Sequence, residues 1–371
     1  MMFALLFSNI KLLFFVLLAL LGLGVLVAIH ECGHFLFAKL FGVRTPSFSI
    51  GMGPVLVSKK WWGTEFKLSA IPFGGYLEIA GQAEIGQGDQ REAHATDRGS
   101  FQVKPYWQKL LIMGGGILFN LLAAFIILVG LFYSGMPKTM FLGGDTLRPV
   151  ISRVLDDSVA QKVGLRAGDE IISVNQVGKL NSSRLIQELQ KNKGRAIELV
   201  VKRDSDLLTL GPTLDKSGML GVEFKAEFLP RYGVLASVKE AVVAVLRLTS
   251  AVVDVVIKIF TQHAVNNLGS PLKFIEYFVN SASEGAAILF FFIAFLSINL
   301  AVFNLIPLPI ADGGQIVFIT IEAIIRRQIP EKIMYGIHLA SWILVMVLAG
   351  YLLVKDSISL FWPKIKALLG I

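Results

Sequence analysis

The chain has 371 residues, of which 54% are hydrophobic and only 17% are charged. A soluble domain carries about 25% charged residues, so this composition is typical of a polytopic membrane protein. The net charge of +8 suits contact with anionic lipid, and the lack of basic runs interleaved with aromatic residues argues against a nucleic-acid partner. The single cysteine, Cys32, excludes an intramolecular disulfide and a cysteine-based zinc cluster.

Four apolar stretches are long enough to cross about 30 Å of hydrocarbon. With their flanking residues they cover 1–40, 107–135, 284–314 and 333–356. The first could be mistaken for a signal peptide, because Lys11 precedes its apolar run. No small-residue cleavage site follows, so we expect this stretch to be retained as the first of four transmembrane helices.

The first span ends on His30-Glu31-Cys32-Gly33-His34. On a helix, H-E-x-x-H places two imidazoles one turn apart on the same face, where both can bind one Zn²⁺. The glutamate between them is then placed to accept a proton from water at the metal. The alternative is that these side chains are only interfacial polar groups at a helix end.

Residues 41–106 contain two stretches of alternating apolar and polar residues, 47–54 and 65–76. Such alternation is typical of strands, so we predict a membrane-associated β-hairpin region on the cytoplasmic side, followed by a polar loop. We expect an exposed edge near Ile50 and Leu68, to which an extended peptide can add as a further strand. An ordinary membrane-associated hairpin is the alternative.

Two segments of different character separate the second and third spans. Residues 145–228 are polar, with three short strand patterns and a helical pattern at Ser182–Lys191 capped by a serine, which predicts an inserted α+β domain. Residues 233–265 are apolar, but Glu240, Arg247 and Asp254 recur every seven residues. This spacing predicts an amphipathic helix that lies on the membrane surface.

The third span closes on Asn304-Leu-Ile-Pro-Leu-Pro-Ile-Ala-Asp-Gly-Gly314. Prolines and glycines break a helix there, and broken backbone at membrane depth is tolerated only where it is buried in protein or lines a wet cavity. Asp312 can supply a third ligand beside His30 and His34, leaving one position of a catalytic zinc for water. This requires that residues 233–265 do not cross the membrane, because a crossing would deliver Asp312 to the opposite face. A solvated helix end is the alternative for Asp312.

Together these residues resemble the site-2 protease family of intramembrane zinc metalloproteases, peptidase family M50, over nearly the whole chain. The inserted domain resembles a single PDZ domain, and the nearest subgroup is that of the bacterial regulator of sigma-E protease. The matching segments are His30–His34, Gly51–Gly53, Ile71–Gly75, Leu268–Pro271 and Asn304–Gly314. The chain departs from the family pattern at Ala311 and Gln315, where the family has Leu and His, and it carries one PDZ-like domain instead of two.

The resemblance implies a zinc endopeptidase that cleaves single-span membrane proteins, either anti-sigma factors or remnant signal peptides. Glu31 would be the catalytic base, and Gly51, Gly53, Asn304 and Pro307 would contact the substrate. The PDZ-like domain would bind a C-terminal carboxylate or exclude bulky ectodomains. The implied location is the bacterial cytoplasmic membrane, with both termini on the outer side and the active site near the cytoplasmic face.

Two other functions compete with this interpretation. A non-catalytic membrane scaffold would bind partners through the PDZ-like domain, but it would have no need to keep Glu31. A metal transporter would need several acidic or histidine residues along a path, and the spans offer only one cluster. His94, His263 and His338 lack partners at ligand spacing, so we expect them to be solvated or interfacial.

Overall fold

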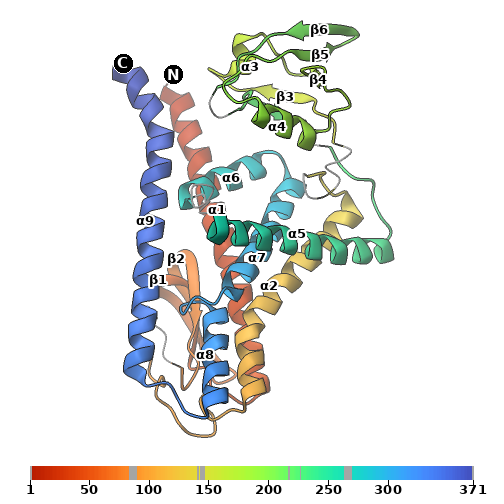
Figure 1. Ribbon diagram of the computed structural model, residues 1–371. Coiled ribbons are helices and arrows are strands. Elements are labelled where there is room, and N and C mark those ends of the chain that lie inside the picture. Colours follow the sequence, from red (N-terminus) through yellow and green to blue (C-terminus); the bar gives the residue numbers. More distant parts are fainter. Residues whose placement is uncertain are drawn as a thin grey trace. The chain divides into compact units, whose positions relative to one another are not determined.

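The computed structural model describes residues 2–82, 90–139, 142, 147–215, 218–225, 227–262 and 270–369 (Figure 1). The chain forms two compact units, residues 1–128 with 245–371 and residues 129–244. The expected roles of His263 and of residues 268–269 lie outside the described residues.

Four of the described helices are long and apolar enough to cross a membrane, as predicted. The candidate spans are Val16–Leu40 in α1 (Met2–Leu40), all of α2 (Tyr106–Ser134), all of α7 (Ala286–Leu305), and Lys332–Ile358 in α9 (Glu331–Leu369). Large apolar side chains are exposed along all four, as expected of surfaces that face lipid.

The expected third span, residues 284–314, is not one continuous element. Helix α7 ends at Leu305, and a second helix, α8 (Asp312–Ile325), begins after a break of six residues. A short helix, α6 (Pro271–Ser283), precedes α7 and packs against α1, α7 and α9. The break places Asp312 at the first position of α8, outside the backbone hydrogen bonds of α7.

The stretch predicted as an amphipathic helix contains α5 (Val234–Gln262), which is not among the candidate spans of the described residues. Its buried side chains recur at helical spacing, at Ala241, Ala244 and Leu248. Charged residues such as Arg247 and Asp254 lie on an exposed face. This pattern agrees with the predicted amphipathic helix; that it lies on the membrane surface and does not cross stays a prediction.

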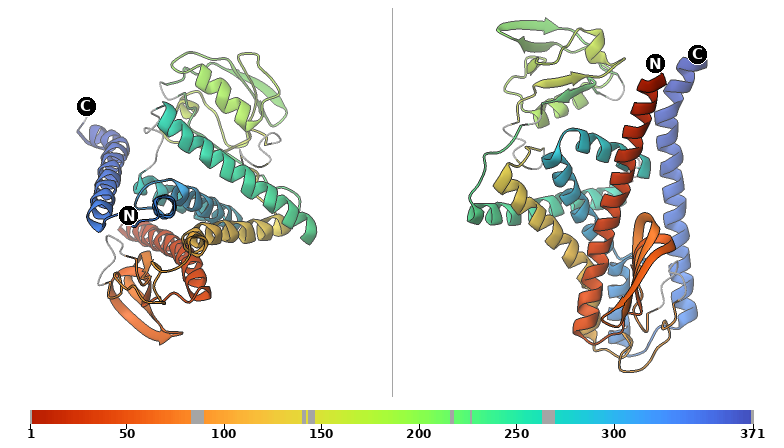
Figure 2. Two further views of the ribbon diagram at one scale, coloured as in Figure 1. Left: turned by 60° about the horizontal axis from the view of Figure 1, so that its bottom comes forward. Right: turned by 180° about the vertical axis from the view of Figure 1, so that it is seen from behind.

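Strands β1 (Ser47–Trp61) and β2 (Thr64–Leu77) form one bent sheet that lies against α1 (Figures 1 and 2). Residues 47–50 of β1 pair with β2 twice, at 65–68 and again at 75–77. The prediction of a free edge at Ile50 and Leu68 is therefore wrong, because both residues have strand partners on either side. The bend could not be read from the alternation pattern. The outer edge of residues 71–77 has no strand partner among the described residues.

The second unit contains a small α+β domain. Strands β4 (Glu170–Val174), β5 (Leu199–Arg203) and β6 (Asp206–Leu210) form one antiparallel sheet, and β3 (Ile151–Val154) pairs with β7 (Val222–Phe224). Helices α3 (Val159–Lys162) and α4 (Ser182–Lys191) complete it. Helix α4 has the predicted bounds, but its N-cap is Asn181, whose side chain accepts from the Arg184 amide, and not a serine.

Two features stabilise this domain. Buried aliphatic side chains from its strands and from α4, including Ile171, Leu185 and Val201, form its hydrophobic core. Beside the core, the Arg203 guanidinium donates to both carboxylate oxygens of Asp169, at 2.8 Å each. Asp169 is 1% exposed, so the ion pair lies at the edge of the core and is not an ordinary surface pair.

Candidate metal centre

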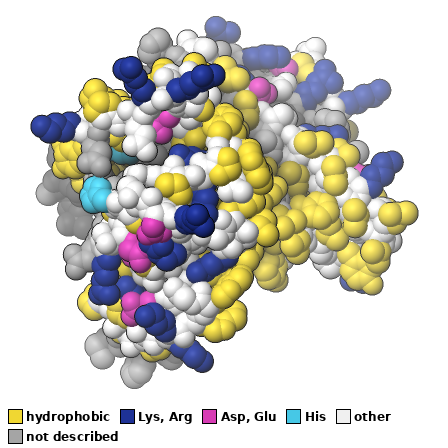
Figure 3. All heavy atoms as spheres, turned by 90° about the horizontal axis from the view of Figure 1, so that it is seen from below, with side chains coloured by type: hydrophobic (Ala, Val, Ile, Leu, Met, Phe, Trp, Pro, Cys, Tyr) yellow, Lys and Arg dark blue, Asp and Glu magenta, His cyan; other side chains and the backbone are white. Residues whose placement is uncertain are grey.

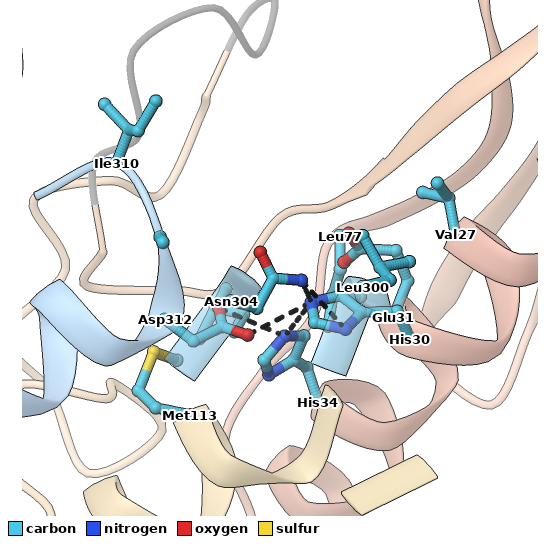
Figure 4. Close-up of a pocket in the computed structure, with 12 residues that line it drawn as sticks. Val27, His30, Glu31, His34, Leu77, Met113, Leu300, Asn304, Ile310 and Asp312 are labelled. Atoms are coloured by element: carbon cyan, nitrogen blue, oxygen red, sulfur yellow. Dashed lines mark hydrogen bonds and ion pairs between the residues drawn. The ribbon is translucent and has the colours of Figure 1, made fainter. Parts of the chain in front are cut away.

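The H-E-x-x-H motif lies on α1, as predicted, and α8 brings Asp312 to it (Figure 4). His30 Nε2 is 3.1 Å from Asp312 Oδ2, and His34 Nε2 is 3.5 Å from Asp312 Oδ1. The two Nε2 atoms are 3.1 Å apart. One potential ligand atom from each of the three residues therefore points at the same place, although Asp312 follows His34 by 278 positions in the chain.

These separations fit a zinc ion. Ligands about 2.0 Å from a tetrahedral metal lie about 3.3 Å from one another, close to the observed separations. Asp312 Oδ2 is buried and makes no hydrogen bond, although His30 Nε2 lies near it. Burying a carboxylate oxygen without a hydrogen bond costs free energy unless a cation lies beside it. The donor set of two imidazoles and one carboxylate is that of catalytic zinc sites with an open fourth position.

Helix α2 supports the two histidines at very short range. A Cβ atom on Gly33 of α1 would overlap the Gly115 carbonyl, and one on Gly116 would lie 2.5 Å from both His30 Cε1 and His34 Nε2. Small residues let membrane helices approach closely, so the Gly114-Gly-Gly116 run explains how α2 fits under the motif. This role of the three glycines was not among the predictions from the sequence.

Helix α2 also contacts the ring nitrogens that face away from Asp312. His34 Nδ1 lies 2.7 Å from the Ile112 carbonyl, which can only accept, so His34 carries its proton on Nδ1 and its Nε2 lone pair is left for a metal. His30 Nδ1 lies 3.0 Å from the side-chain amide of Asn120, which is fully buried. Such partners fix the tautomer and orientation of metal-ligating histidines. Asn120 was not among the predicted site residues, although a polar side chain inside an apolar span is a signal that could have identified it.

Asp312 is held by the folded-back start of α8. A Cβ atom on Gly313 or Gly314 would overlap the carbonyl of Leu305 or Leu308, so only glycine allows α8 to turn back so tightly on the end of α7. Gln315 then donates to the Pro309 carbonyl at 3.0 Å and lies 2.9 Å from His338 Nε2 in α9.

His338 is not solvated, contrary to one of the two expectations for it, since its ring is buried against Phe318 and meets Gln315. Its partner lies 23 positions away and no ligand spacing marks it. Gln315 thus occupies the position where the sequence departs from the family pattern, and it serves there as a polar link between α8 and α9.

A cavity of about 220 Å³ opens onto the three ligand residues. A water molecule accounts for about 30 Å³ of liquid, so the cavity has room for water and a peptide group together. Glu31 lines it, with its carboxylate in reach of the Leu77 backbone at the end of β2 (Figure 4). The remaining lining residues are Val27, Leu77, Ile79, Met113, Leu300, Asn304, Ile310 and Ala311.

The four residues expected to contact substrate lie in different places. Asn304 lines the cavity, with its side-chain nitrogen 3.4 Å from His30 Nε2. Gly51 and Gly53 lie at the bend of β1, both with φ near +80°, where other residues would be strained. Pro307 is exposed in the break between α7 and α8. Gly51, Gly53 and Pro307 are not among the described residues that line the cavity.

Comparison with known proteins agrees with this geometry. The profile of peptidase family M50 matches residues 18–348. A Clostridium perfringens protein named as a zinc metalloprotease is 33% identical over 351 residues, covering 93% of this chain and 98% of its own. A Synechocystis protein named in the same way is 31% identical over 360 residues, covering 92% and 94%. The chain therefore belongs to peptidase family M50, the site-2 protease family, and is a zinc metalloprotease.

Proposed function

We propose that this protein is an intramembrane endopeptidase that cleaves single-span membrane proteins near the cytoplasmic face of the membrane. The observation that carries the proposal is the convergence of His30, His34 and Asp312 beside Glu31, with both histidines on a helix able to span a bilayer. Anti-sigma factors and remnant signal peptides are the substrates we infer from the resemblance to the regulator of sigma-E protease.

His30, His34 and Asp312 would hold the zinc. When bound, zinc supplies Lewis acidity, which polarises a carbonyl and makes water easier to deprotonate. Glu31, on the same helix and lining the same cavity, accepts the proton from the attacking water and then delivers one to the leaving amine.

The substrate must be unwound before it is cut, because a helix hides its peptide bonds behind its own hydrogen bonds. We propose that the unwound peptide pairs with residues 71–77 of β2, whose outer edge has no strand partner among the described residues. This strand ends at Leu77, which lines the cavity beside Glu31. A peptide added there would therefore lead into the cavity.

The remaining expected residues would act around this edge. Asn304 can donate its amide hydrogens to a peptide carbonyl in the cavity. Gly51 and Gly53 maintain the bend of β1 that leaves residues 71–77 outermost. Pro307 keeps the exposed break open to a passing chain. The small α+β domain would act as a single PDZ-like domain that either binds a C-terminal carboxylate or excludes bulky ectodomains.

The decisive experiment uses the purified full-length protein in detergent with a single-span reporter substrate. Glu31→Gln should still bind one zinc per chain, while the rate of cleavage falls by about 10²–10⁴, the contribution of a positioned acid–base group. Glu276→Gln, an exposed position on α6, is the matched control and should cleave normally.

Undiminished cleavage by Glu31→Gln would rule out this base. A scaffold function would instead be supported if His34→Ala and Asp312→Ala lost their zinc yet left the cellular phenotype unchanged.

A further inference from the structure

A second cavity, of about 270 Å³, lies between the start of α2 and the end of α8. The Tyr106 hydroxyl lies 3.1 Å from Thr320 Oγ1 and ties the two helices together there. The lining residues are Gln102, Tyr106, Lys109, Ile319, Glu322, Ala323, Arg326, Arg327 and Gln328. None of them belongs to the metal centre.

The lining of this cavity is cationic. Lys109, Arg326 and Arg327 bring three positive charges, and Glu322 brings the only negative charge among the described lining residues. Glu322 is already engaged, because its Oε1 accepts from the Ile329 amide at 2.9 Å. The Lys109 ammonium lies over the Phe101 ring, 5.6 Å from its centre. Arg326 and Arg327 are exposed, and no ion pair is found for either among the described residues. The surplus of two positive charges calls for an anion.

The surface beside the cavity is apolar. On α8, Ile321 and Ile325 are exposed and Ile324 is 75% exposed; on α2, Trp107 is 54% exposed. The end of the molecule seen from below in Figure 3 accordingly shows Lys and Arg side chains next to broad hydrophobic areas. A tryptophan at the end of a span is typical of the membrane–water interface. A free phosphate would use only the charges, whereas a phospholipid would use the charges and the apolar flank together.

We propose that this cavity binds the headgroup phosphate of an anionic phospholipid, with the acyl chains lying along the exposed isoleucines of α8. Basic pockets between membrane helices recognise anionic headgroups in this way. The site is separate from the metal centre and does not depend on the proposed function. A lipid bound there bridges α2, which contacts both histidines, and α8, which carries Asp312.

The test measures phosphatidylglycerol bound to the full-length protein in phosphatidylcholine nanodiscs, counted by native mass spectrometry. Each basic residue near an anionic surface contributes about 1 kcal/mol, so Arg326→Ala with Arg327→Ala should weaken binding roughly 30-fold. Arg326→Lys with Arg327→Lys should retain most of the affinity. Lys59→Ala with Lys60→Ala removes two exposed charges from β1 and should change little.

A variant of opposite sign guards against a folding defect. Glu322→Gln keeps an oxygen that can accept from the Ile329 amide but removes the negative charge, so it should tighten binding about fivefold. Equal losses in the β1 control would overturn the proposal, since they would show unspecific attraction. Full displacement of the lipid by inorganic phosphate at equal concentration would also overturn it, because the site would then take a soluble anion.

Discussion

Asn120 presents its side-chain amide to His30 Nδ1 at 3.0 Å, while the other nitrogen of the same ring faces Asp312. If His30 Nε2 binds zinc, Nδ1 must carry the proton and its partner must accept it. An amide can turn its oxygen or its NH₂ group to this place, and zinc selects the oxygen. Asn120 is thereby a positioning residue for the metal centre, on a helix that supplies no ligand.

Two substitutions at Asn120 should have different effects on zinc affinity. Asn120→Leu removes the acceptor and should weaken zinc binding by roughly 10- to 100-fold, which is the usual effect of losing a hydrogen-bond partner of a metal ligand. Asn120→Asp keeps an acceptor and should retain the metal. Zinc content after dialysis against graded chelator measures both. If the aspartate variant lost zinc as readily as the leucine variant, Asn120 would be a donor to His30 and this assignment would fail.

The two glycines Gly114 and Gly116 provide a matched pair on α2. A Cβ atom on Gly116 would press on both imidazoles, whereas one on Gly114 would meet nothing within 4 Å. Gly116→Ala should therefore lose zinc and cleavage, while Gly114→Ala should be neutral or slightly stabilising, by up to about 1 kcal/mol from helix propensity. Metal analysis and thermal unfolding of the purified variants distinguish these outcomes. Normal zinc content in Gly116→Ala would show that α1 and α2 can separate.

Gln315 should control how firmly Asp312 is held. Its amide donates to the Pro309 carbonyl and meets His338, so Gln315→Leu removes both links at once. We expect faster hydrogen exchange in residues 306–311 and weaker zinc binding in this variant. Val317→Ala, an exposed position on the same helix, is the control and should leave both unchanged. Unaltered exchange in Gln315→Leu would mean that the glycines alone fix the break.

The Asp169–Arg203 pair predicts how the small α+β domain responds to acid. Burial of Asp169 opposes ionisation, but hydrogen bonds from Arg203 and from the Arg166 amide outweigh it and lower the pKa of Asp169 below its usual value near 4. The stabilisation is therefore complete above about pH 4 and is lost as the pH falls through the lowered pKa. Asp169→Asn should cost about 2 kcal/mol at pH 7 and less in acid.

Hydrogen exchange of β4 and β5 in the full-length protein, followed from pH 7 to pH 3, measures this difference. The wild-type and Asp169→Asn curves should converge at the acid end. Parallel curves over the whole range would show that the ionised pair contributes nothing.

Local patterns in the sequence were sufficient to predict the four candidate spans and the cluster of His30, His34 and Asp312. Apolar length identified the four helices, and the spacing of His30 and His34 is a property of any helix. Asp312 was predicted from the prolines and glycines that break the third span beside an ionisable residue, and its place near the histidines then limited the number of crossings between them. These inferences rely on the length of apolar runs and on the spacing of residues, which are local properties of the sequence.

Tertiary pairing explains what the sequence did not reveal. Alternation marked two strands, but it could not show that residues 47–50 pair twice and so cover the edge expected at Ile50. His338 and Gln315 meet across 23 positions, and neither carries a spacing signal. The role of Asn120 depends on the 3.0 Å approach of α2 to His30, which requires the glycines that let the helices touch.

The hydrogen bond between His34 Nδ1 and the Ile112 carbonyl bears on how the protein behaves when zinc is removed. Zinc fingers unfold without their metal because nothing else orders their ligands. Here backbone from α2 already fixes one imidazole, and helix packing fixes the other ligand-bearing segments. Chelation should therefore silence the protein without unfolding it, and returning zinc should restore it, so that metal supply can act as a reversible control on a permanently folded protease.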